Sequence, residues 1–406
     1  MDLKSGYPYW AIRNGLMHAF PPLQGNLRCE VAVVGGGITG ALIADELARH
    51  DHQVVVLERC DIAWGSTSAS TALLQYEIDT HLRDLAKRYG EANAVLAYRH
   101  CADAIGGLAA AAKAVGAVDF KAMDSLYFAN RRRHVADLHD EFFLRLRHGF
   151  DVEWLDERDL HRKHGLHAPA AILSRPAACI DPYRMAYKLF ARLHRQGVPV
   201  HDRSEVTGLD VVRGAVTLRV GCGSSVRAQH VILAAGYASQ RWLKQDVARN
   251  RSSYAFVTDP LDAELLDGLA RIQVWETARP YLYLRSTGDH RLLVGGEDDA
   301  IDIPARRDAR VLGKSRRLVK QVARRFPRLQ LEPVYAWGGT FAETIDGLPF
   351  FGPHPQYGPR VHFAMAYGGN GITYSMLGAG LLRARIERRK HPLATLFSFD
   401  RLRTSR

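Results

Sequence analysis

Long apolar runs are absent from this sequence. Its 406 residues contain no window of about 18 uncharged apolar residues, the length that a membrane-spanning helix requires. The first residues, MDLKSGYPYWAIRNG, also lack the apolar stretch and the small-residue cleavage site of a signal peptide. Apolar residues make up 47% of the chain and charged residues 24%, which is ordinary for a globular protein. We therefore expect a soluble, cytoplasmic protein with roughly two or three domains.

Cysteine is scarce and scattered. No two cysteines form a C-x-x-C pair, and the five of them are Cys29, Cys60, Cys101, Cys179 and Cys222. This spacing argues for a reducing compartment and against a disulfide framework or a structural zinc site. The 18 histidines show no H-x-x-x-H or H-E-x-x-H pattern, so we expect no metal ion.

Acidic residues are outnumbered by basic ones, and the formal net charge is +12. Much of the excess lies in the short runs Arg131–Arg133, Arg306–Arg307, Arg316–Arg317, Arg324–Arg325 and Arg388–Lys390. A nucleic acid, an anionic substrate or a membrane surface could attract such a chain. Because the runs are short and no base-reading motif accompanies them, we interpret them as solvated surface and expect no specific nucleic-acid partner.

A β-α-β pattern follows the N-terminal segment. Residues 30–34 form an apolar strand, residues 38–49 keep one apolar helical face, and residues 53–57 form a second apolar strand. This is the unit from which parallel sheets are built.

Three glycines and one acid stand at the turns of this unit. Gly35, Gly37 and Gly40 have G-x-G-x-x-G spacing: the first allows a tight turn, the second lets a pyrophosphate approach the backbone, and the third lets helix and strand pack closely. Glu58 ends the second strand, where a carboxylate can accept hydrogen bonds from a ribose and repel a 2′-phosphate. The loop GSTSASTALLQ (65–75) has small and hydroxyl side chains that can lie against a large planar cofactor. Together these features predict a dinucleotide site that does not take NADP.

The rest of the chain mixes helices with strands. We expect an ordered arm that packs on the body from the aromatic and proline residues Tyr7, Pro8, Tyr9, Trp10, Pro21 and Pro22. Periodicity predicts helices over 80–115, 134–148, 181–196 and 307–326, and strands over 216–220, 230–234 and within 254–300.

Five blocks of sequence carry a family resemblance through their order and spacing. They are VAVVGGGITG (31–40), Glu58 with GSTSAS behind it, VILAAGYAS (231–239), WGGTFAETIDGLPFFG (337–352) and YGGNGITYSMLGAGLL (367–382). The chain thereby resembles the D-amino-acid oxidase superfamily of flavoproteins, above all its glycine oxidase, sarcosine oxidase and γ-glutamylputrescine oxidase branch. The resemblance covers nearly the whole chain and implies an FAD-dependent enzyme.

The resemblance also assigns cofactor contacts. It implies that the glycine loop faces the FAD pyrophosphate, that Glu58 holds the ribose, and that a Gly-rich turn before the last helix caps the flavin. The residues so implicated are Gly35, Gly37, Ile38, Thr39, Gly40, Glu58, Arg59, Ser66, Thr67, Ser68, Ser70, Thr71, Val206, Ala235, Gly236, Asp346, Gly368, Gly369, Asn370, Gly371, Ile372 and Thr373. Asp346 fits the family's T-x-D-x-x-P element but could equally be a turn former before Gly347. Since no cysteine follows Cys222, we expect the FAD to be non-covalent.

One departure from the family concerns the substrate. Members that oxidise α-amino acids commonly carry an arginine–proline pair just upstream of the T-x-D element, whereas this chain reads Gly338–Phe341 there, without arginine. An α-carboxylate would lose its fork-shaped partner. We therefore expect a small amine without an α-carboxylate, with Thr340 in the arginine's place.

A second strand supplies the other candidate catalytic residues. Tyr281, Tyr283 and Arg285 alternate with leucines, so they share one strand face, which in the superfamily tends to wall the flavin. A solvent-facing strand is the alternative. Arg285 could also bind a distant carboxylate or replace the missing clamp. Trp275 and Glu276 are weaker candidates for the same cavity.

We expect an α/β fold with two interleaved domains. A Rossmann-like FAD-binding domain of glutathione-reductase type would use residues 1–85, 155–240 and 335–406. A substrate domain with a mixed, largely antiparallel sheet would use 86–154 and 241–334.

The expected reaction moves a hydride from the carbon next to an amine nitrogen to flavin N5, and the imine then hydrolyses. Electrons would pass to oxygen or a carrier, because no second dinucleotide fingerprint follows a strand. Three alternatives remain: an amino-acid oxidase or dehydrogenase with a relocated clamp, a hydroxylase or alcohol dehydrogenase on the same scaffold, and a flavoprotein acting on nucleic acid.

Overall fold

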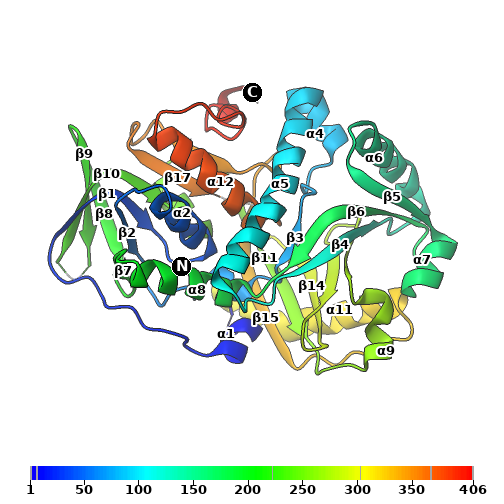
Figure 1. The fold of residues 1–406 in the computed structure, drawn as a ribbon. Coiled ribbons are helices and arrows are strands. Elements are labelled where there is room, and N and C mark those ends of the chain that lie inside the picture. Colours follow the sequence, from blue (N-terminus) through cyan, green and yellow to red (C-terminus); the bar gives the residue numbers. More distant parts are fainter. Residues whose placement is uncertain (1, 6–7, 222, 302, 366–367, 405–406) are drawn as a thin grey trace.

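The computed structural model describes residues 2–5, 8–221, 223–301, 303–365 and 368–404. Tyr7 of the expected arm, Cys222 and Tyr367 of the last sequence block lie outside these residues. Two large sheets stand side by side, and helices cover them (Figure 1). The expected α/β fold with a second, largely antiparallel sheet is confirmed.

The first sheet is parallel at its centre. Its strands follow the order β16 (Phe350–Pro353), β17 (Val361–Met365), β10 (Ser225–Leu233), β1 (Leu27–Val34), β2 (Val54–Leu57) and β7 (Val200–His201). The strands from β17 to β7 run parallel, and the hairpin of β8 (Val206–Val212) and β9 (Ala215–Val220) joins β10 antiparallel.

Strand β1 shows why this sheet has a core on both faces. Val31 and Val33 pack into the large core under the helices, whereas Ala32 and Val34 pack into a second core with the β8–β9 hairpin. All four side chains are buried, as a continuous apolar run in a central parallel strand predicts.

The second sheet is antiparallel except for one pair. Its order is β15 (Tyr335–Glu343), β11 (Arg249–Val257), β14 (Leu292–Asp299), β13 (Leu282–Ser286), β12 (Ile272–Glu276), β4 (Lys121–Phe128), β6 (Ala170–Cys179) and β3 (Leu73–Gln75), with β5 (Asp151–Asp156) on β6. Only β12 and β4 are parallel among these described pairs.

Helices cover the first sheet and one side of the second. In Figure 1, α2 (Ile38–Ala48, blue) and α12 (Gly371–Ile386, red) lie together, and α5 (Glu91–Val115) and α8 (Pro182–Arg195) pack beside them. Against the second sheet lies α11 (Val311–Arg325). The remaining helices are α1 (Tyr9–Asn14), α3 (Ser66–Ala69), α4 (Leu82–Tyr89), α6 (Val135–Arg147), α7 (Glu157–His164), α9 (Ala263–Leu266), α10 (Pro304–Asp308) and α13 (Arg401–Thr404).

Some predicted elements have different boundaries. The helix expected over 80–115 is interrupted at Gly90, whose φ of 81° ends α4 before α5 begins. The loop expected over 65–75 contains α3 and β3. Helix α8 begins as predicted, with the Asp181 side chain accepting a hydrogen bond from the Arg184 backbone N–H.

Sheet membership cuts across the expected domain segments. Strands β3, β6 and β15 come from the segments expected to form the FAD-binding domain, yet they belong to the second sheet. Helix α5 comes from an expected substrate segment and packs on α8 and α12. The division of the chain into two domains therefore stays a prediction.

Candidate active site

A cavity of about 680 Å³ opens between the two sheets. Its lining combines Gly35, Glu58 and Ala234 from the first sheet with Tyr283 and Thr340 from the second. Residues distant in sequence therefore meet here, at the carboxyl ends of β1, β2 and β10, where ligands of open α/β sheets bind.

The glycine loop leaves room for a pyrophosphate. A Cβ atom on Gly35 would lie 2.3 Å from the Ala234 carbonyl oxygen, and one on Gly40 would lie 1.9 Å from the Gly35 carbonyl oxygen. These two glycines permit the tight turn and the close packing of α2 on β1. Gly37 lines the cavity, and a Cβ there would meet only the Thr67 hydroxyl, at 3.0 Å. The loop thus fits the group that its spacing predicts.

Glu58 is tied to this loop by its carboxylate. Gly36 N–H donates to Glu58 Oε2 at 2.6 Å, and Cys60 N–H donates to Oε1 at 2.9 Å. Burial raises the pKa of Glu58, and the two backbone hydrogen bonds oppose that rise. The carboxylate lines the cavity with its position fixed, so its free lone pairs can accept from ribose hydroxyls.

The hydroxyl-rich segment lines the cavity through part of its length. Thr67 Oγ1 accepts a hydrogen bond from Ile38 N–H, 3.0 Å away, at the first turn of α2. Ser66, Ser70 and Thr71 also line the cavity, whereas Ser68 is fully buried and donates to the Gly65 carbonyl.

The start of α12 closes the cavity from another side. Gly368 to Ile372 line it, and Gly369 N–H donates to Asp79 Oδ2 at 2.8 Å. Thr39 of α2 shares a hydrogen bond with Ser375 of α12, 2.7 Å apart, which holds the two helix starts together. Both helices therefore direct backbone N–H groups and their dipoles toward the cavity.

Aromatic rings form the wall on the second sheet. Tyr283 packs across Gly295, where a Cβ would lie 2.2 Å from the ring, and its hydroxyl is 3.0 Å from Ser253 Oγ. The Trp275 ring stacks on Tyr127 with centroids 3.8 Å apart and lies 6.3 Å from the Tyr281 ring. Burial raises the pKa of both Tyr281 and Tyr283, so they stay neutral hydroxyl groups.

Three carboxylates line the cavity beside these rings. Asp298, at the end of β14, has a pKa raised to about 7, first by burial and also by the charges of Asp79 and Glu343. Burial raises the pKa of Asp79 as well. Glu343 pairs with Arg251 and with Arg279 Nη1, the latter at 3.2 Å. Asp298 Oδ1 is buried without a hydrogen-bond partner among the described residues.

Most residues predicted from the sequence converge on this cavity. Those that line it are Gly35, Gly37, Ile38, Thr39, Glu58, Arg59, Ser66, Thr67, Ser70, Thr71, Val206, Ala235, Gly236, Gly368, Gly369, Asn370, Gly371, Ile372, Trp275, Tyr281, Tyr283 and Thr340. Gly40, Ser68, Thr373, Asp346, Arg285 and Glu276 are described but do not line it.

Three of the residues that do not line the cavity make polar contacts elsewhere in the fold. Asp346 forms an ion pair with Arg401 at 2.7 Å and accepts hydrogen bonds from Tyr89 and from the Leu348 backbone. Thr373 donates to the Gln75 carbonyl. Glu276 accepts a hydrogen bond from Leu282 N–H within its own sheet.

Arg285 lies behind the cavity wall. It is 1% exposed, and its guanidinium donates to the carbonyl oxygens of Thr71, Ile180 and Ser286. The strand alternation places it on the face of Tyr283, but it does not line the cavity and instead donates to Thr71, which does. Arg285 thus braces a part of the lining.

No local sequence pattern marks the three acids. Asp79 and Asp298 lie outside the five sequence blocks, and only long-range packing brings them to Glu343. One surface interpretation was wrong: Arg307 is fully buried and donates to Thr340 Oγ1 at 3.1 Å, because the N-terminal arm covers it. Its neighbour Arg306 is exposed, as expected.

Two classes of feature are not found among the described residues. None of their helices combines the length and apolar character needed to cross a bilayer. No group of three or more of their His, Cys, Asp and Glu side chains is placed to hold a metal ion.

Comparison with known proteins agrees with this geometry. The chain is 26% identical over 400 residues to γ-glutamylputrescine oxidoreductase of Escherichia coli (strain K12), covering 94% of this chain and 89% of the relative. It is 26% identical over 388 residues to glycine oxidase of Geobacillus kaustophilus (strain HTA426), covering 92% and 96%. The crystal structure of glycine oxidase from Geobacillus kaustophilus superposes with a TM-score of 0.78 at 21% identity, over 92% of this chain and 98% of that one.

The family model described as DAO, FAD dependent oxidoreductase, matches residues 30–385. That match contains the glycine loop, Glu58, the aromatic wall and the start of α12. The chain belongs to the DAO family and is an FAD-dependent oxidoreductase.

Proposed function

We propose that this protein oxidises the C–N bond of a small amine that lacks an α-carboxylate. The observation that supports this proposal is the acid-rich, aromatic end of the cavity, where Asp79, Asp298 and Glu343 stand beside Tyr281 and Tyr283. Carboxylates attract an ammonium group and repel a carboxylate, and aromatic faces attract cations as well.

Asp298 is the best-placed partner for the ammonium. No ion pair joins it to a basic side chain of the described residues. A hydrogen bond from the Ser253 side chain lowers its pKa, but its Oδ1 atom is buried without a hydrogen-bond partner. A buried polar oxygen left unpaired is costly, so an ammonium that donates to it would gain more than one binding to a solvated acid. Asp79 and Glu343 are already engaged, by the Gly369 backbone and by two arginines respectively.

Among the described residues, the arginines beside the aromatic wall are engaged by other groups, which argues against an α-carboxylate clamp there. Arg285 donates to three carbonyl oxygens and stands behind the lining. Arg279 lies over the Tyr281 ring, 4.5 Å from its centroid, and pairs with Glu343. Thr340 already accepts a hydrogen bond from Arg307. We therefore infer that Thr340, Tyr281 and Tyr283 shape the substrate site and that Arg285 positions its wall.

The chain's own contribution to the reaction would be positioning and proton handling. When bound, FAD supplies the two-electron oxidation by accepting a hydride at N5. The amine must be uncharged to release that hydride, and Asp298, with a pKa near 7, can hold the proton that the ammonium loses. Loss of the hydride turns the carbon–nitrogen single bond of the neutral amine into a protonated imine. Water then converts that imine to a carbonyl compound and to ammonium, or to a protonated amine where the substrate is N-substituted.

The deciding experiment is an anaerobic screen. The yellow protein is mixed with a panel of amines and α-amino acids, and the visible flavin absorbance is followed. We expect a primary or N-substituted amine to bleach it, while glycine, sarcosine and D-alanine leave it unchanged. The proposal fails if an ordinary α-amino acid reduces the flavin faster than any amine does. NADPH consumption that depends on substrate would indicate a hydroxylase instead.

Two further properties are part of the proposal. The FAD is non-covalent, so acid precipitation releases it into the supernatant; flavin that stays with the pellet would contradict this. The reduced enzyme passes its electrons to oxygen or to a carrier. Release of hydrogen peroxide in air would indicate oxygen as the acceptor.

A further inference from the structure

Three consecutive backbone carbonyls in the cavity lining are each held by a different buried side chain. The donor–carbonyl pairs and their distances are Trp337 Nε1 to Ala69 (2.9 Å), Trp10 Nε1 to Ser70 (2.7 Å) and Arg285 Nε to Thr71 (2.8 Å). Each donor residue is only 1% exposed, and the three come from β15, α1 and β13. Residues 69–71 all line the cavity, so hydrogen bonds from three separate elements fix the path of this stretch.

Residues 69–71 connect the glycine loop with the aromatic wall. Just before them, Thr67 Oγ1 accepts a hydrogen bond from Ile38 N–H at the first turn of α2. At their other end, a hydrogen bond from the Thr71 side chain opposes the raised pKa of Tyr283, which places Thr71 beside the wall. A ligand that extends from the glycine loop to the wall therefore lies against this stretch.

One of the three donors, Trp10, belongs to the N-terminal arm. Residues 2–5 of the arm lie along β15, where Lys4 forms an antiparallel bridge with Gly339. Its second described stretch, residues 8–14, contains α1 and Trp10. Helix α1 packs on α3, the short helix just before the Ser70 carbonyl, and on α8. The arm therefore contacts the cavity segment through its helix as well as through Trp10.

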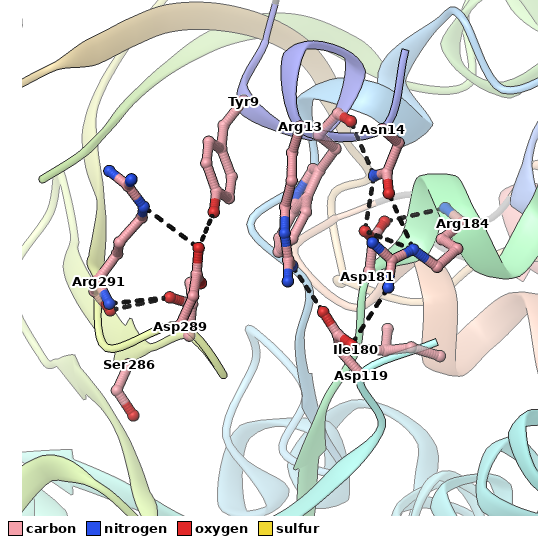
Figure 2. A network of polar contacts seen from close by, with 12 residues as sticks. Tyr9, Arg13, Asn14, Asp119, Ile180, Asp181, Arg184, Ser286, Asp289 and Arg291 are labelled. Atoms are coloured by element: carbon pink, nitrogen blue, oxygen red, sulfur yellow. Dashed lines mark hydrogen bonds and ion pairs between the residues drawn. The ribbon is translucent and has the colours of Figure 1, made fainter. Parts of the chain in front are cut away.

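Polar contacts anchor α1 on both sides of Trp10. Figure 2 shows them, and the pairs with their distances are Tyr9 to Asp289 (2.7 Å), Arg13 to Asp119 (2.6 Å) and Asn14 to Asp181 (2.8 Å). The three carboxylates lie between β13 and β14, just before β4 and at the start of α8. Because α1 is tied to three separate parts of the fold, it is held in one position, and Trp10 with it.

Trp10 differs from the other two donors in what holds it. Arg285 and Trp337 lie within paired strands of the second sheet, whereas Trp10 depends on the anchors of a short helix. The Arg285 guanidinium lies 5.5 Å from the centre of the Trp10 ring, so the two donors also support each other. The loss of an α1 anchor should therefore free the Ser70 carbonyl first.

We propose that α1 is a positioning element of the active site, in which Trp10 holds residues 69–71 in the shape that receives the flavin part of FAD. Trp10 does not line the cavity, so it acts through the Ser70 carbonyl and not by touching a ligand. The glycine loop and Glu58 fit the pyrophosphate and the adenosine ribose, which leaves the stretch toward the aromatic wall for the flavin. The proposal rests on FAD binding alone and holds for any substrate.

The test compares FAD with ADP, which has the pyrophosphate and the adenosine but no flavin. Apoprotein of each full-length variant is titrated with both ligands. Trp10→Phe keeps an aromatic ring and removes the N–H donor. Trp242→Phe is the matched control, because its indole nitrogen has no hydrogen-bond partner among the described residues and its side chain does not line the cavity.

We expect Trp10→Phe to raise the FAD dissociation constant by about 3- to 10-fold, because the stretch that receives the flavin loses one fixed carbonyl. The ADP dissociation constant should stay within about twofold of the parent, and Trp242→Phe should match the parent for both ligands. Unchanged FAD binding, or an equal weakening of ADP binding, would overturn the proposal. It would do so even if Trp10→Phe unfolds at a lower temperature, since a loss of stability alone would be a purely structural role.

Disruption of an anchor tests the role of the helix. Arg13→Gln removes the ion pair with Asp119, and neither residue lines the cavity. We expect it to weaken FAD binding in the parent and to add little in the Trp10→Phe background, because both changes act through the same carbonyl. Arg13→Lys keeps the charge and should recover most of the affinity. No effect in the parent, or an effect of equal size in both backgrounds, would show that α1 does not act through Trp10, and the proposal would be wrong.

Discussion

The two ends of the cavity are built from different materials. At the end that we propose for the nucleotide, called the nucleotide end below, the loop around Gly35 and Gly37 presents backbone N–H groups. A single carboxylate, Glu58, is fixed by that same backbone. At the other end, which we propose for the substrate and call the substrate end below, side chains from β12, β13, β14 and β15 provide aromatic rings and acids. The hydrogen-bonding groups of the first end are fixed in position by the backbone, whereas the charge of the second end depends on pH.

This difference separates the effects of substitution. A change at a glycine that lines the cavity alters the space available and should abolish cofactor binding at every pH. A change among the acids alters an electrostatic balance and should move a pH profile while the cofactor stays bound. The predictions below separate the two ends further.

The largest effect is expected from Gly37→Val. The branched side chain would enter the cavity beside Thr67, where only a backbone atom now faces the pyrophosphate region. We expect FAD affinity to fall beyond measurement, while the apoprotein unfolds at nearly the parent temperature. Absorbance of the purified protein and thermal denaturation measure the two quantities.

Gly40→Ala is the matched control within the same loop. Its methyl group would meet the Gly35 carbonyl at 1.9 Å, away from the cavity lining. We expect the apoprotein itself to lose about 1–3 kcal/mol of stability, as overpacked sites do. If Gly37→Val and Gly40→Ala destabilised the apoprotein equally, the loss of FAD in Gly37→Val could be explained by disturbed packing of the loop.

Glu58→Ala should have the next largest effect on the nucleotide end. It removes a charged acceptor for the ribose and leaves two backbone N–H groups without their partner. We expect a loss of about 1–3 kcal/mol in FAD binding. An unchanged dissociation constant, measured by fluorescence titration, would mean that the acid serves only the loop.

Asp298→Asn should act on the substrate end and leave FAD content unchanged. Below its pKa of about 7 the parent's Asp298 is protonated and loses its attraction for an ammonium, so amine reduction of the flavin should rise as pH increases through 7. The asparagine variant should lose that rise and react roughly tenfold more slowly at pH 8. Identical pH profiles for the two proteins would remove Asp298 from the substrate site.

The same aspartate affects folding in the opposite direction. Its pKa is raised from about 3.8 to about 7 on folding, so the folded state holds a proton that the unfolded state has released. Between these values the stability of the parent apoprotein should fall as pH rises, relative to Asp298→Asn. Chemical denaturation of both apoproteins at pH 4.5 and pH 7.5 gives the difference.

The smallest effect is expected outside the cavity. Replacing the exposed run Arg131–Arg133 with glutamine should leave the FAD content unchanged. It should change the unfolding free energy by no more than about 0.5 kcal/mol. Binding of the parent to RNA or DNA should disappear by roughly 200 mM salt. Tight binding above that salt concentration, lost in the glutamine variant, would make this run a nucleic-acid site.

Local signals made the nucleotide end predictable from the sequence. Gly35, Gly37 and Gly40 lie within six residues, and the strands around them are continuous apolar runs, so their arrangement depends on short-range geometry. The core alternation in β1 follows from the same pattern. The fold class could be predicted for the same reason.

The substrate end could be predicted only in part. Strand alternation put Tyr283 and Arg285 on one strand face, yet only Tyr283 lines the cavity, because alternation predicts a face and does not show what covers that face. Asp79, Asp298 and Glu343 meet through the order of β14 and β15 and the approach of α12, which depends on long-range packing. Asp346 matched a sequence element, yet its partner Arg401 lies 55 residues further along the chain.

The repeated crossing of the chain between the two sheets affects how the protein unfolds. It passes from one sheet to the other after β2, after β6, after β10 and after β15, and the passages after β2 and β10 supply cavity residues. Cleavage of the chain at one position would therefore leave the two sheets connected. A ligand in the cavity would contact the connecting segments as well as both sheets. Heating should therefore melt the two sheets in one cooperative step, and the midpoint should climb with the concentration of added FAD, as mass action requires of a ligand that binds only the native state.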